Sequence, residues 1–111
     1  MDTKLVIAVS WWAQRLQKGD KVAFAKSLLE SITASKPKRL FVDYDPENEL
    51  LAAVRAAGVE CRGVLFSADG ILPQKTGMWI MADKIEVREG YRAPIETIWD
   101  ASWFDEAKST A

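Results

Sequence analysis

The chain has 111 residues, with 15 basic and 16 acidic side chains, five tryptophans, one cysteine and no histidine, and its formal net charge is −1. This length fits one globular domain over residues 1–111, and the lack of histidine excludes a Ser-His-Asp triad, an imidazole base and a histidine metal ligand. A single cysteine excludes an intramolecular disulfide and a cysteine-based zinc site, and the near-neutral charge gives no global attraction to nucleic acid.

The first segment, residues 3–17, fits two structures. The continuous apolar run over residues 5–9 fits a strand. This run is too short for a signal-peptide core or a membrane span, so we expect a cytoplasmic protein. A helix is favoured because no glycine or proline interrupts the segment before Gly19 and because its apolar residues share one helical face. That apolar stripe consists of Leu5, Ala8, Val9, Trp12 and Leu16.

A second helix is predicted after Gly19. Asp20 is a suitable N-cap, and Pro37 ends the helix. The joint that follows, residues 36–39, is a small basic cluster that we interpret as a solvated connection, with contact to a phosphate as the alternative. The apolar stripe predicted for this helix consists of Val22, Ala25, Leu28, Leu29 and Ile32.

Residues 39–67 predict a βαβ unit. Residues 39–44 and 64–67 are rich in branched and aromatic side chains, as strands are. The helix between them is predicted to begin at Asp45 and Pro46 and to end before glycine 58. Short joints between strand, helix and strand predict two parallel strands with a right-handed crossover. The buried stripe predicted for this helix consists of Leu50, Leu51, Val54 and Ala57.

The C-terminal part of the chain changes to antiparallel signals. A loop over residues 68–77 precedes a hairpin with arms at residues 78–81 and 85–88. A last strand follows at residues 95–99, and Asp100 is placed to cap a short helix. The fold class is therefore α+β, in which two N-terminal helices, a βαβ unit and a C-terminal β-hairpin form one small mixed sheet.

The sequence of residues 66–73, together with residues 77–79 and 89–94, resembles small accessory proteins of unknown function from bacteriophage and prophage genomes. The resemblance carries no catalytic motif, so it assigns no functional residue. It implies a bacteriophage origin, in which a small protein often binds and inhibits a host factor.

Asp43, Asp45 and Asp69 are the sharpest candidates for chemistry. They lie at or just after the ends of two predicted parallel strands, whose carboxyl ends meet at one sheet edge. Carboxylates in such a position can hold Mg²⁺ or Mn²⁺, with Lys75 facing a phosphate. The Asp-x-Asp pair is similar to the first motif of haloacid-dehalogenase phosphatases and to the acidic pair of Toprim domains. The chain departs from both, because it is too short for the other phosphatase motifs and lacks the earlier strand-end glutamate of Toprim. A structural role is favoured over the metal site, since Asp45 is also the expected N-cap of the third helix.

Trp11 lies about 100° from Trp12 around the first predicted helix, on a polar side that also carries cations. Because tryptophan is a preferred anchor of protein interfaces, this side predicts a partner-binding site made of Trp11, Lys4, Arg15 and Lys18. The alternative is that the Trp11 ring is a lid over the sheet edge. The surrounding cations favour an acidic surface on the partner.

These observations favour a non-enzymatic binding protein without a cofactor that acts through a protein partner, as an inhibitor of a host factor would. Two alternatives stay open. The first is a divalent-metal-dependent phosphoryl-transfer enzyme that uses Asp43, Asp45 and Asp69. The second is a single-stranded nucleic-acid binder that stacks bases on Trp11. The sequence does not set the oligomeric state.

Overall fold

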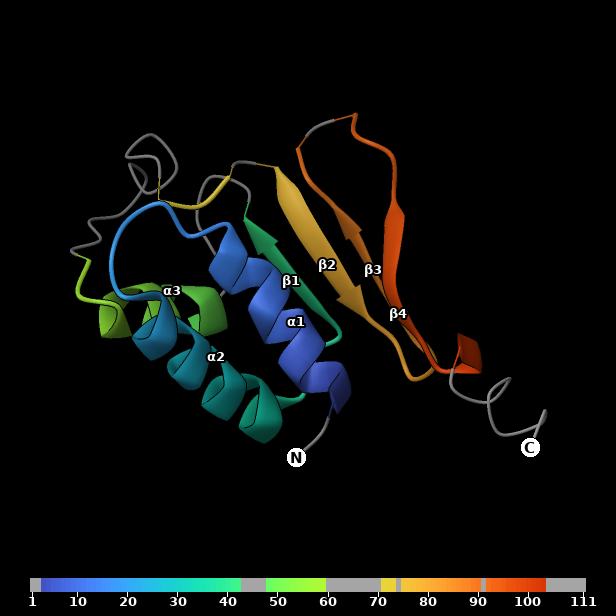
Figure 1. Ribbon diagram of the computed structural model, residues 1–111, viewed down its shortest axis with the longest axis horizontal. Coiled ribbons are helices and arrows are strands. Elements are labelled where there is room, and N and C mark those ends of the chain that lie inside the picture. Colours follow the sequence, from blue (N-terminus) through green and yellow to red (C-terminus); the bar gives the residue numbers. More distant parts are fainter. Residues whose placement is uncertain (1–2, 43–47, 60–70, 74, 91, 104–111) are drawn as a thin grey trace.

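In the described part of the chain, three helices pack against one side of a four-stranded sheet in the computed structural model (Figure 1). The structure describes residues 3–42, 48–59, 71–73, 75–90 and 92–103. This arrangement confirms the α+β class. The elements in chain order are α1 (Thr3–Gln14), α2 (Lys21–Ser35), β1 (Arg39–Val42), α3 (Asn48–Ala56), β2 (Thr76–Ile80), β3 (Lys84–Arg88) and β4 (Glu96–Asp100).

The described strands form an antiparallel sheet in the order β1-β2-β3-β4. β2 and β3 confirm the predicted hairpin, and β4 confirms the predicted last strand. The prediction of a mixed sheet built on a βαβ unit is wrong, because β1 pairs antiparallel with β2 and places Leu40 opposite Met78. The second strand predicted for that unit, residues 64–67, lies outside the described residues. A local pattern identifies a strand, but its partner is chosen by non-local packing.

Alternation along the strands gives the sheet two different faces, since successive side chains of a strand point in opposite directions. The face toward the helices is apolar and buried, and the other face is mixed and partly exposed. The buried face carries Leu40, Val42, Met78, Ile85 and Val87. The opposite face carries Arg39, Phe41, Gly77, Trp79, Glu86 and Arg88.

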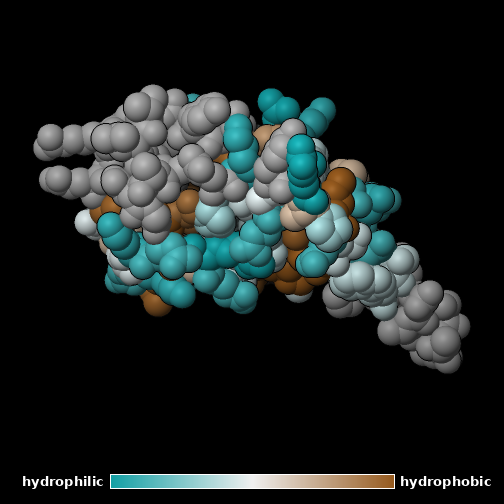
Figure 2. All heavy atoms as spheres, turned by 90° about the horizontal axis from the view of Figure 1, so that it is seen from above, coloured by the Kyte–Doolittle hydropathy of each residue, from teal (hydrophilic) through white to brown (hydrophobic). Residues whose placement is uncertain are grey.

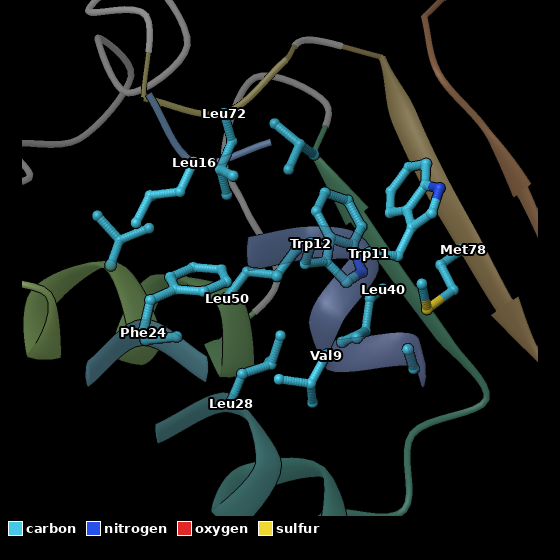
Figure 3. Close-up of a cluster of buried hydrophobic side chains, with 14 of the residues drawn as sticks. Val9, Trp11, Trp12, Leu16, Phe24, Leu28, Leu40, Leu50, Leu72 and Met78 are labelled. Atoms are coloured by element: carbon cyan, nitrogen blue, oxygen red, sulfur yellow. The ribbon is translucent and has the colours of Figure 1, made fainter. Parts of the chain in front are cut away.

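α1 confirms the helical interpretation of the first segment. Its predicted stripe is buried, apart from Leu5, which packs at the edge of the core. Figure 3 shows Val9 and Trp12 of this helix in one cluster with Leu28 of α2 and Leu40 of β1. The hydrophobic core therefore joins the helices to the sheet.

α2 begins where it is predicted to begin, but the side of the helix that is buried differs from the predicted side. The Asp20 carboxylate accepts hydrogen bonds from the N–H groups of Val22 and Ala23, at 2.9 and 3.2 Å, which confirms the N-cap. Val22 is 78% exposed, whereas Phe24, which the predicted stripe omits, is fully buried. The two positions lie about 200° apart on a helix, and Phe24 is one turn before Leu28 on the buried side.

α3 confirms the third predicted helix from Asn48 onward. Its predicted start, at Asp45 and Pro46, lies outside the described residues. Leu50 is fully buried, and Gly58 follows the helix with a φ of 88°, the left-handed conformation expected where a helix ends at glycine.

Two connecting segments contribute to the fold. Ile71 and Leu72, expected in a loop, are buried in the core, and the Ile71 carbonyl accepts the Gln17 N–H at 2.9 Å. After β4, the Asp100 carboxylate accepts the N–H and the hydroxyl of Ser102 at 2.9 and 2.7 Å. These hydrogen bonds lower the pKa of Asp100. The short helix that Asp100 is predicted to cap would continue past residue 103, outside the described residues, so it stays a prediction.

Hydrophilic side chains cover most of the described surface seen in Figure 2, and hydrophobic side chains show in smaller patches between them. The large apolar side chains most exposed among the described residues are Val22, Ile95 and Trp103. Within the same residues, no helix has both the length and the apolar character needed to cross a membrane.

Candidate functional site

Trp11 is buried, whereas the sequence predicts an exposed ring. Its side chain is 8% exposed, and its ring meets that of Trp12 edge to face, with the centroids 5.0 Å apart. Figure 3 shows both residues on the side of α1 that faces the strands. The predicted exposure is wrong because α1 is covered on two sides, by α2 and by the sheet. The ring instead fits the alternative of a lid against the sheet.

Arg15 makes its contacts within the chain. Its guanidinium carbon lies 3.7 Å from the centroid of the Trp11 ring, and Nη1 donates to the Trp11 carbonyl at 2.9 Å. Nη2 forms an ion pair with Glu89 Oε1 at 3.2 Å. The stacked cation and its ion pair hold the Trp11 ring in place beside the residue that follows β3.

Lys4 and Lys18 lie far from each other. Lys4 Nζ donates to the Met81 carbonyl and lies 5.3 Å from the centroid of the Trp99 ring. Lys18 is exposed in the connection between α1 and α2. Lys4 and Arg15 are separated by three helical turns, about 16 Å. The residues of the predicted partner-binding site therefore do not form one patch, and Lys4 is the member that lies at a large groove.

The acidic residues of the metal hypothesis, Asp43, Asp45 and Asp69, lie outside the described residues. Within the described ranges, no group of three or more His, Cys, Asp or Glu side chains is placed to hold a metal ion. Lys75, expected to face a phosphate beside these acids, lies just before β2 with a φ of 57°. The Mg²⁺ or Mn²⁺ site stays a prediction.

A groove of about 640 Å³ is lined by residues from the start of α1, the end of α2 and the end of β2. Its volume falls in the range of sites that bury most of a small ligand or several side chains of a peptide. The floor of the groove is apolar. It consists of Leu5, Leu29, Ile32, Ile80 and Met81.

Three lysines border this floor. Lys36 and Lys38 are exposed at the joint after α2, and Lys4, from the start of α1, donates to the Met81 carbonyl. No acidic side chain lines the groove among the residues that the structure describes. The rim therefore favours negative charge, while the floor favours apolar side chains.

The joint between α2 and β1 places two of these lysines. Lys36 caps α2 in the left-handed conformation, with φ 48° and ψ 57°, and its N–H donates to the Ile32 carbonyl at 2.9 Å. Pro37 prevents the helix from continuing, and the Lys38 carbonyl accepts the Ile80 N–H at 2.8 Å. The sequence shows this basic cluster, but not that α1 and the end of β2 complete a groove beside it.

Comparison of the sequence with protein-family models and with curated proteins gives no match. The resemblance to bacteriophage accessory proteins stays a prediction. Function is therefore inferred from the side chains of the groove and from their charge.

Proposed function

We propose that the chain is a non-enzymatic binding protein whose groove takes an acidic segment of a partner protein. The observation that carries this proposal is an apolar floor bordered by Lys4, Lys36 and Lys38. Among the described residues, the lining of the groove offers no carboxylate or thiol, so it supplies binding contacts rather than an acid–base pair.

The groove fits a segment in which apolar anchors alternate with acidic residues. Burial of one or two anchors on Leu5, Leu29 and Ile80, which are partly exposed, would supply most of the affinity. Neighbouring carboxylates would meet the exposed Lys36 and Lys38, which steer the encounter and fix the orientation more than they add affinity. A segment held in this way is withheld from other partners, which is how a small binding protein inhibits a host factor.

The test is a binding titration with a labelled peptide that carries leucine and phenylalanine anchors among aspartates and glutamates. We expect this peptide to bind at least about tenfold more tightly than a peptide of equal charge whose anchors are replaced by serine, because the floor then has no apolar side chains to bury. Fluorescence anisotropy measures both affinities, and binding should weaken as the salt concentration rises.

Two double variants separate the groove from general charge. Lys36→Asn with Lys38→Gln removes two rim charges, and asparagine tolerates the left-handed backbone of residue 36, so we expect about fivefold weaker binding. Lys21→Gln with Lys26→Gln removes two exposed lysines of α2 that do not line the groove, and this control should bind like the unchanged chain. Equal losses in both double variants, or equal affinity for the two peptides, would contradict the proposal.

A further inference from the structure

The sheet face that points away from the helices carries aromatic and basic side chains. Phe41 of β1 and Trp79 of β2 are both partly exposed on this face. Arg39 lies opposite Trp79 on the neighbouring strand, and Arg88 of β3 lies opposite Gly77, which pairs with Phe41 on its other side. On β1, β2 and β3, the acidic side chain of this face is Glu86, which lies opposite Trp79.

Gly77 allows the two rings to form one platform. The Phe41 and Trp79 rings meet edge to face, with the centroids 5.2 Å apart and the planes at 86°. A Cβ atom on Gly77 would lie 2.7 Å from Cε1 of Phe41, closer than such atoms approach. The Phe41 ring therefore lies over the Gly77 backbone, in space that any other residue at this position would fill.

Cations surround the platform. The guanidinium carbon of Arg39 lies 5.2 Å from the centroid of the Phe41 ring. A hollow of about 230 Å³ beside the rings is lined by Lys75 and Arg88, and no acidic side chain lines it among the described residues. Arg88 Nε is buried there without a hydrogen-bond partner in the described part of the chain. The positive charge is thus local to this face, since the whole chain has a net charge of −1.

We propose that this face binds single-stranded nucleic acid, with bases stacked on Trp79 and Phe41 and the backbone phosphates beside Arg39, Arg88 and Lys75. Aromatic side chains on a sheet, flanked by cations, bind unpaired bases because every base has a face that stacks and a charged phosphate next to it. This function goes beyond the proposed protein binding and uses a different surface. It also differs from the predicted base stacking on Trp11, which burial prevents.

An unpaired strand fits this face better than a duplex does. The bases of a duplex are stacked on one another and cannot reach the rings without being flipped out. The site has two aromatic rings and three cations, so it would contact two or three nucleotides, and binding should fall with salt at a slope of about −2 on a logarithmic plot.

The experiment titrates the full chain against labelled oligo(dT) and oligo(U), with fluorescence anisotropy as the readout. Binding of either strand supports the proposal, and the oligonucleotide that binds more tightly shows whether the face prefers DNA or RNA. A labelled duplex of the same length should bind at least about tenfold more weakly. No binding to either single strand, or equal binding to the duplex, would overturn the proposal.

Matched variants locate the site. Trp79→Leu should weaken binding about tenfold, and Arg88→Gln should make the salt slope shallower by about 0.7. The controls are Trp103→Leu and Arg55→Gln, which change an exposed tryptophan and an exposed arginine elsewhere.

Circular dichroism shows whether each variant folds. If Trp79→Leu does not fold, Arg39→Gln with Arg88→Gln removes two cations of the face and should abolish most of the binding. Equal losses in the controls, or full displacement of the oligonucleotide by the acidic peptide of the groove test, would show that the face does not bind nucleic acid specifically.

Discussion

Trp11 and Trp12 are adjacent residues of one helix with different surroundings. Trp12 is fully buried in the stripe that joins the helices, while Trp11 packs toward the sheet under the stacked guanidinium of Arg15. The indole N–H of Trp12 is buried without a hydrogen-bond partner among the described residues. Trp12 therefore stabilises the fold through buried area and ring contact, and an unpaired donor offsets part of that gain.

Both tryptophans should be needed for stability. We expect Trp12→Ala to lower the free energy of unfolding by about 3–5 kcal/mol and Trp11→Ala by about 3 kcal/mol, because each leaves a cavity in packed surroundings. Trp103→Ala, which truncates a half-exposed ring, should change it by less than about 0.5 kcal/mol. Urea denaturation curves provide the three values. If Trp11→Ala behaves like Trp103→Ala, the Trp11 ring is not part of the core.

At the scale of elements, the joint between α1 and α2 docks on the end of α3. The Asp20 N–H donates to the Ala57 carbonyl at 3.0 Å. Gly19, with a φ of 94°, lies so close to that carbonyl that a Cβ atom would be 2.8 Å from its oxygen. Two connections that are distant in sequence are thus held together by backbone contact, which requires glycine at position 19.

Gly19→Ala should therefore cost more than an ordinary glycine substitution. We expect a loss of about 2 kcal/mol or more, from the left-handed backbone together with the clash against the Ala57 carbonyl. Gly58→Ala is the matched control, because Gly58 has a similar φ of 88° but nothing within 4 Å of its added Cβ, so about 1 kcal/mol is expected. Thermal melts followed by circular dichroism compare the two. Equal shifts in Tm would mean that the close approach at Gly19 relaxes at no cost.

The helices could be predicted from the sequence because their signals are local. Asp20 and Gly58 mark a start and an end through contacts within one turn, and the structure confirms both. The partner of β1 could not be predicted, because pairing with β2 depends on packing between distant segments. The same reason explains Ile71, which lies in a stretch with loop composition and yet fills the core.

At the scale of the whole molecule, the two proposed binding surfaces use different residues of the β1–β2 pair. The groove is next to Ile80 and Lys38, whereas the hollow beside the aromatic platform is next to Gly77 and Val42. The first opens between the helices and the strand end, and the second lies on the sheet face that the helices do not cover. No lining residue is shared between them.

The two ligands should therefore bind independently. We expect the affinity for the acidic peptide to change by less than about threefold when the oligonucleotide is bound, because the groove and the hollow share no lining residue and salt at physiological concentration weakens the repulsion between two bound anions. A peptide titration with and without saturating oligonucleotide measures the coupling. Mutual exclusion of the two ligands would mean that they share one surface.

Neither surface could be assembled from the sequence alone. Residues 36–39 are visible as a basic cluster, but the apolar floor beside Lys36 comes from α1, α2 and β2 together. Phe41 and Trp79 are remote in sequence, and the register of β1 with β2 makes them neighbours. For Trp11 the sequence instead predicts a surface that the fold covers. A helical wheel shows the angle of Trp11 around α1, but it does not show that the sheet lies on that side.

The order of the strands also has a consequence for the kinetics of folding. β2, β3 and β4 follow one another along the chain, so a pair such as Ile80 and Ile85 requires the closure of only a short loop. β1 joins from far away, since Val42 pairs with Thr76 after α3 has intervened. Closing a long loop costs more entropy, so the three-stranded meander should form before β1 docks. Both surfaces include residues of the β1–β2 pair. A chain that is still folding therefore has neither surface until β1 has paired with β2.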